Sequence, residues 1–140
     1  MAKTDRFKKD HQNLMQLAME LSKHLNADVL AKDAAPVCKL LTKIGTELLM
    51  HTMSEDSNLY PLLLKSTDQK VRDTATTFQK EMGGIKTVVK GYFDKWSTPA
   101  AIQKDPKGFI TATMGLLGSL KTRLDKENTV LFTLVEKMAA

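Results

Sequence analysis

The sequence contains few residues of several kinds, and each shortage excludes a class of protein. Its single cysteine, Cys38, cannot form a disulfide within the chain, so a reducing, cytoplasmic location is expected. No apolar run approaches the roughly 20 residues that span a bilayer, so no membrane association is expected. The first nine residues are rich in charge and lack the apolar segment of a secretory signal.

Aromatic residues are also scarce, at 6%, and they do not alternate with basic residues as in a nucleic-acid-binding surface. The net charge is +5, but the lysines are spread along the whole chain, which is typical of a solvated surface. We therefore expect no nucleic-acid partner. The sequence contains no Ser-His-Asp arrangement, phosphate-binding loop or paired-cysteine site, so enzymatic activity would require a redox metal and is not expected otherwise.

The composition and the periodicity of the chain predict one helical domain. Hydrophobic residues make up 42% of 140 residues, which suits a single globular domain over residues 1–140. In four segments, apolar residues recur every three or four positions, the pattern of amphipathic helices. These segments cover residues 4–25, 36–65, 67–96 and 106–138. The pattern predicts an all-α, up-down-up-down four-helix bundle without a sheet.

Capping residues and prolines agree with this division. Asp33 with Pro36 can begin the second helix, and Asp105 with Pro106 can begin the fourth. Pro61, near the end of the second helix, is expected to kink that helix or end its regular part.

The two halves of the chain repeat one another. His11 aligns with Met82 at an offset of about 71 residues, and the second and fourth helices align at an offset of about 72. In the second alignment His51 matches Arg123, while Glu55 matches Glu127. The chain therefore reads as two helical hairpins related by a pseudo-twofold axis, with equivalent positions facing each other across the core.

Polar residues lie on the apolar faces of these helices and require an explanation, and they include His11 on the first helix and Arg123 on the fourth. His51 and Glu55 are four residues apart, so they project from the same face. Glu127 occupies the equivalent place in the other hairpin. A buried carboxylate requires a cation, a proton or a hydrogen-bond donor, and a metal ion bound by imidazole and carboxylate groups satisfies that requirement.

The same motifs resemble those of the hemerythrin (HHE cation-binding) family. His51-Thr-Met-Ser-Glu55, followed by Leu-Tyr-Pro61, is similar to the family's second-helix motif. Phe7-Lys-Lys-Asp-His11 is similar to its first-helix motif, and Arg123-Leu-Asp-Lys-Glu127 to its fourth-helix motif, with arginine in place of histidine. The resemblance covers nearly the whole chain and implies a hemerythrin-like bundle.

The resemblance also implies a function and a ligand set. Members of this family hold two irons bridged by carboxylates, and they handle dioxygen, nitric oxide or iron, or act as sensors. Carried over by position, the ligands are His11, His51, Glu55 and Glu127. The other two positions, Met82 and Arg123, depart from the pattern, so a full di-iron site is not expected.

Three hypotheses follow from this incomplete set. In the first, the guanidinium of Arg123 lies between Glu127 and Glu55 and replaces the metal charge. The domain is then a metal-free binding or signalling module of bacterial type, without a cofactor. In the second, His11, His51 and Glu55, with Glu127 as a fourth ligand, hold one ion, with iron expected before zinc or manganese. In the third, His51 and Glu55 lie on the surface.

Two further features remain open from the sequence alone. The partner is unknown and is expected to be a protein or a small ligand. Gly83-Gly84 after Met82 leaves space beside the site for a small ligand or a channel, or instead permits close helix packing or a local kink.

Overall fold

The computed structural model describes residues 4–139, where helices joined by short connections make up the regular secondary structure and no β-strand occurs. The prediction of an all-α fold is confirmed. Residues 1–3 and 140, which belong to the expected domain and in part to the charged N-terminal segment, lie outside the described residues. Between residues 4 and 139, no helix is both long enough and apolar enough to cross a membrane.

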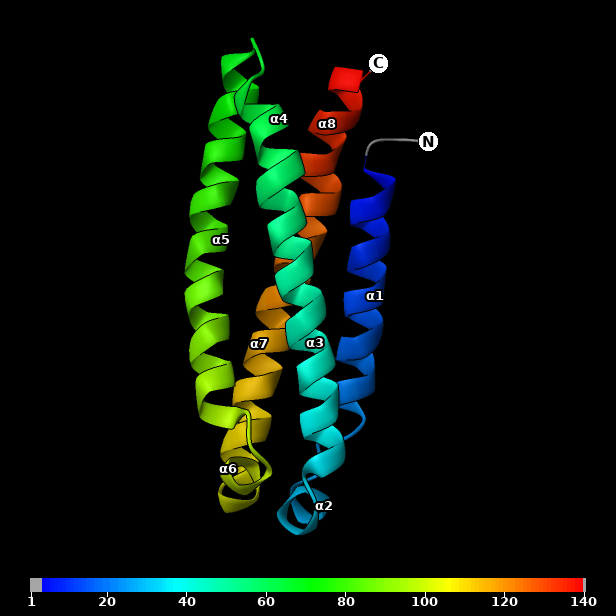
Figure 1. The fold of residues 1–140 in the computed structure, drawn as a ribbon, viewed down its shortest axis with the longest axis vertical. Helices are drawn as coiled ribbons and strands as arrows, with labels where there is room; N and C mark the ends of the chain where they lie inside the picture. The colour runs from blue at the N-terminus through cyan, green and yellow to red at the C-terminus, as the bar shows by residue number, and fades with distance from the viewer. Residues whose placement is uncertain (1–3, 140) are drawn as a thin grey trace.

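Four long helical stretches lie side by side along the molecule (Figure 1). The first is α1 (Asp5–Ser22), and the third is α5 (Gln69–Trp96). The second consists of α3 (Ala35–Ser54), the π-helical turn η1 (Glu55–Leu59) and α4 (Tyr60–Leu64). The fourth consists of α7 (Pro106–Lys126), the π-helical turn η2 (Glu127–Leu131) and α8 (Phe132–Ala139). The predicted segments agree with these bounds to within about three residues.

Two short helices were not predicted. They are α2 (Ala27–Lys32) and α6 (Pro99–Lys104), which lie at the end of the molecule opposite the termini (Figure 1). Each begins at a side-chain cap: Asn26 Oδ1 accepts the amide of Val29, and Thr98 Oγ1 accepts the amide of Ala101. Such caps stabilise a helix by about 1 kcal/mol. This stabilisation helps a helix of fewer than two turns to form between two long helices.

The expected helix starts are present. Asp105 Oδ1 accepts the amide of Gly108 at 3.0 Å, and Pro106 is the first residue of α7. Asp33 Oδ1 accepts the amide of Ala35 at 3.1 Å at the start of α3. Pro61 lies in the first turn of α4, after regular α-helix has ended at Ser54.

The π-helical turns have a cause other than proline. Both η1 and η2 begin at a glutamate, Glu55 or Glu127, and η2 contains no proline. In both stretches most buried residues are spaced four apart in the sequence. An α-helical turn holds only 3.6 residues, so in a continuous α-helix these residues would gradually rotate away from the core. A wider turn returns them to the core. Steps of four are seen in Ile44, Leu48, Thr52, Glu55, Leu59 and Leu63, with one step of three before Glu55.

The core consists of two apolar clusters separated by a polar layer. One cluster includes Leu14, Leu48 and Leu120, and the other includes Phe7 and Leu59. Between these apolar residues, the first, second and fourth stretches hold the polar positions, which are His11, His51, Glu55, Arg123 and Glu127. All are buried. The bundle therefore places its ionisable side chains in one layer, with water excluded from above and below.

Candidate metal centre

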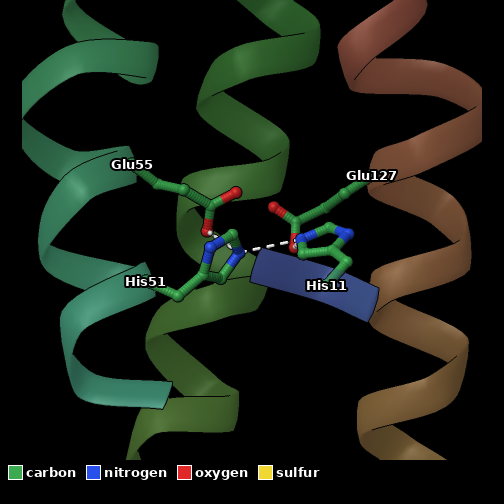
Figure 2. Close-up of side chains that lie close together, drawn as sticks. All are labelled: His11, His51, Glu55 and Glu127. Atoms are coloured by element: carbon green, nitrogen blue, oxygen red, sulfur yellow. Dashed lines mark hydrogen bonds and ion pairs between the residues drawn. The ribbon is translucent and has the colours of Figure 1, made fainter. Parts of the chain in front are cut away.

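Four side chains from three helical stretches converge in the polar layer (Figure 2). His11 comes from α1 and His51 from the last turn of α3, while Glu55 and Glu127 are the first residues of η1 and η2. One ligand atom from each residue lies within 4.8 Å of all the others. None of the four side chains is more than 2% exposed.

The two imidazoles point the same nitrogen at each other. His11 Nε2 lies 2.8 Å from His51 Nε2. His51 Nε2 is 3.3 Å from Glu55 Oε1, and His11 Nε2 is 3.6 Å from Glu127 Oε1. Two nitrogens and two carboxylate oxygens therefore face a common volume, as ligands around one ion do.

The opposite nitrogens of the two rings differ in their partners. His11 Nδ1 is within hydrogen-bond distance of Asn128 Oδ1, at 2.9 Å, whereas His51 Nδ1 lies 3.6 Å from the carboxylate of Asp10 and makes no hydrogen bond among the described residues. An amide oxygen only accepts, so His11 carries its proton on Nδ1 and directs the Nε2 lone pair at the cluster. The short contact with His51 then needs a proton on the second ring or a cation that both Nε2 atoms bind.

Neither glutamate has a donor among the described residues. No oxygen of Glu55 or Glu127 accepts a hydrogen bond there, although both side chains are completely buried. Burial raises the pKa of Glu55, and the neighbouring Glu127 carboxylate raises it further. Burial also lowers the pKa of His51, and it lowers that of His11 to about 4 despite the opposing effect of Glu127. A bound cation would remove the cost of holding these groups together out of water.

Arg123 does not lie between the two glutamates. Its Nη1 donates to Glu81 at 2.9 Å, and its Nη2 donates to the carbonyl oxygen of Phe78 at 2.6 Å and to the Tyr60 hydroxyl at 3.4 Å. The guanidinium also stacks 4.4 Å from the ring centre of Phe78. It favours ionised Glu55 only through space, and that effect is smaller than those of burial and of Glu127. The geometry assumed in the first hypothesis is therefore not observed.

Met82 and the glycine pair also have clear positions. Met82 is buried, with 4% of its surface exposed, and lines a pocket between α3 and α5. Gly83 and Gly84 are exposed, and a Cβ atom built on either would have no neighbour within 4 Å. The glycines therefore neither enlarge the site nor permit close helix packing. They lie on the solvent-exposed face of α5.

Some residues that contact the cluster were not recognised from the sequence. Asp10 and Asn128 immediately flank His11 and Glu127 in the chain, and Glu81 immediately precedes Met82. The only available signal is a polar neighbour next to an expected ligand. That signal is weak because adjacent residues project about 100° apart on a helix.

A helical bundle with histidines and glutamates clustered in its core defines a class, the carboxylate–histidine bundle proteins. The family model of the hemerythrin HHE cation-binding domain matches residues 2–135, and the chain belongs to this family. The resemblance deduced from the sequence motifs is confirmed. No curated protein and no solved structure matches the chain.

Proposed function

We propose that this domain binds a single metal ion, iron, through His11, His51, Glu55 and Glu127. We further propose that it senses or handles dioxygen, nitric oxide or iron. One observation carries the proposal: four buried ligand atoms lie within 4.8 Å of one another, and both carboxylates lack a hydrogen-bond donor among the described residues.

The donor set favours a first-row transition metal. Imidazole nitrogen suits iron, zinc, copper and nickel, and carboxylate oxygen suits harder ions such as manganese. Iron accepts both, and it is the ion that the family resemblance puts first. Bound iron would supply a redox-active centre able to accept a small ligand beside its protein ligands.

The surrounding residues have defined tasks in this proposal. Asn128 accepts from His11 Nδ1 and so keeps the Nε2 lone pair directed at the ion, and Asp10 favours the same orientation for His51. The apolar clusters on either side exclude water. Arg123 and Met82 occupy the pseudo-equivalent positions of His51 and His11, which supports one ion rather than two.

The competing hypothesis is a metal-free binding or signalling module. It required Arg123 to balance the two carboxylates directly, and the hydrogen bonds of Arg123 go instead to Glu81, Phe78 and Tyr60. Metal binding therefore accounts for the glutamates better. The two functions differ in one measurable quantity, the metal content of the protein.

Protein produced in iron-rich medium is expected to contain about one equivalent of metal by elemental analysis, together with a visible absorption spectrum if that metal is ferric iron. The His11→Ala variant is expected to lose the metal, because it removes one of two imidazole ligands. His24→Ala is the matched control, since His24 is exposed and outside the cluster. A content well below one equivalent in the wild type, after reloading with iron, zinc and manganese, would refute the proposal.

Asn128→Ala is expected to weaken metal binding by roughly 10–100-fold, as is usual when a partner of a ligating histidine is removed. The physical reason is that His11 then loses the acceptor that fixes its tautomer. A competitive titration with a chelator measures the change. Thr129→Ala, an exposed site on the same turn, is the control, and Asn128→Asp should restore binding because it retains the acceptor. Unchanged affinity in Asn128→Ala would show that the contact does not orient the ring.

A further inference from the structure

An apolar groove of about 430 Å³ lies between α3 and α5. Its walls include Leu48, Leu49 and Met53 from α3, and Ile85, Val89 and Phe93 from α5. Pockets of this size and character ordinarily take small molecules.

The groove exists because α3 and α5 diverge. The end of the second stretch, α4, packs closely on α5, whereas α3 and α5 make few backbone contacts. Gly45 allows the Phe93 ring to lie against α3, since a Cβ atom at Gly45 would be 3.3 Å from Phe93 Cζ. The Phe93 ring fills part of the space between α3 and α5. The rest of that space is the groove, which is open to solvent.

The lips of the groove combine exposed apolar side chains with lysines on one side only. On the α3 lip, Leu49 and Met53 are 61% and 59% exposed. On the α5 lip, Lys86 and Lys90 lie four residues apart and therefore share a face. Lys86 is 2.8 Å from Asp56, the only acidic residue among the lining residues, whereas Lys90 is 3.4 Å from Asp94, which lies outside the lining. The lining is therefore apolar and carries two lysines against one carboxylate, and the ion pair of Lys90 with Asp94 is largely exposed, which makes it weak and leaves Lys90 able to meet another anion.

From this arrangement we propose that the groove binds a small anionic amphiphile, a carboxylate on an alkyl chain. The chain would lie against Leu48, Ile85 and Val89, and the carboxylate would lie beside Lys90. Residues 45 to 56 of the lining span about 16 Å of helix at 1.5 Å per residue, which suits an extended chain. The inference does not depend on metal binding.

A second copy of the chain fits the groove less well. A stable dimer buries about 800 Å² on each partner. On α3 the exposed large apolar side chains of this region are confined to Leu49, Met50 and Met53, among the described residues. This narrow strip suits a slender ligand better than a flat protein surface.

Calorimetric titration of the whole chain with decanoate tests the proposal, alongside decanol and decyltrimethylammonium as neutral and cationic probes of the same chain length. Decanoate is expected to bind with one site and to bind more tightly than either of the other two. Leu49→Glu is expected to weaken decanoate roughly tenfold through like-charge repulsion, while Leu49→Lys retains it. Both substitutions are at an exposed position, so the fold should tolerate them.

Lys90→Gln should weaken decanoate but not decanol, and Lys80→Gln, an exposed lysine on the same helix outside the lining, should change neither. Equal binding of all three probes, or binding unaffected by Leu49→Glu, would overturn the proposal. Absence of decanoate binding would overturn it as well. If light scattering then showed a dimer that Leu49→Glu dissociates, the groove would be a self-association surface instead.

Discussion

Removing the metal with a chelator lowers the melting temperature of this protein by roughly 10–20 °C, if the proposed centre is correct. A ligand that binds only the folded state stabilises it by about 4 kcal/mol when its free concentration is a thousand times its Kd. In a domain of this size that free energy corresponds to a shift of the stated order. The expected shift is large because the apo cluster keeps two buried carboxylates without donors among the described residues. Thermal unfolding of chelated and reloaded protein measures it.

The Glu55→Gln variant separates this effect from general destabilisation. Glutamine has nearly the same shape but no charge, so it removes a ligand without leaving a cavity. The variant is expected to show no shift on reloading, while its chelated form is at least as stable as chelated wild type, because burial already favours the neutral form of Glu55 and the glutamine amide is neutral too. Glu20→Gln is the control, since Glu20 is exposed on α1 and should preserve the full shift.

Two results would count against the centre. A wild-type melting temperature that does not respond to iron, zinc or manganese would show that no ion binds the folded state. A chelated Glu55→Gln variant much less stable than wild type would show that Glu55 makes a structural hydrogen bond, which the described residues do not provide.

The positions of the long helices were predictable because each buries a continuous apolar face. A helix rotated about its axis would expose its apolar face to water. The apolar positions of that face are therefore the positions that are buried in the bundle. The same reasoning singles out His11, His51, Glu55 and Glu127 in the sequence, because polar residues on an apolar face stand out from their neighbours. The internal repeat pairs the two glutamates across the core, and the fold brings them into one cluster.

Other features depend on packing that a linear pattern does not encode. The periodicity at Glu55 and Glu127 looks continuous, yet the backbone there widens into π-helical turns that keep steps of four on one face. The short helices α2 and α6 are set by local caps, too brief to show a period. Their signals, Asn26 and Thr98 with Pro99, can be recognised only by looking for caps in the connections.

The direction of a long side chain was the least predictable feature. Arg123 lies one turn before Glu127 on the same face, which made a direct contact with the glutamates reasonable. The guanidinium instead donates hydrogen bonds to the Phe78 carbonyl oxygen and to the carboxylate of Glu81. Neither acceptor can be identified from the helical period, because one is a backbone atom and the other lies on a half-exposed side chain.

Arg123→Ala is expected to destabilise the metal-free protein by about 2–4 kcal/mol, measured by urea unfolding. Arg123 is 3% exposed and its guanidinium stacks on Phe78, so its removal leaves a cavity and deprives the Phe78 carbonyl oxygen of its side-chain donor. The loss of stability is smaller than for breaking a fully buried ion pair. The reason is that the side chain of Glu81, the ion-pair partner of Arg123, is 46% exposed and can be solvated by water. Glu81→Gln should therefore cost much less, since the amide oxygen still accepts.

The same variant distinguishes the two proposed roles of the arginine. If Arg123 is only a fixed positive charge beside a metal centre, its removal strengthens cation binding several-fold, because repulsion between the guanidinium and the ion is lost. Arg123→Met, which restores apolar volume without charge, should then recover part of the stability and keep the tighter binding. If Arg123 replaces the metal, the wild type binds no ion, and Arg123→Met recovers none of the stability, because the loss then follows charge rather than volume. Chelator competition and urea unfolding on the two variants therefore decide whether this arginine excludes a second ion from the bundle or takes the place of the first.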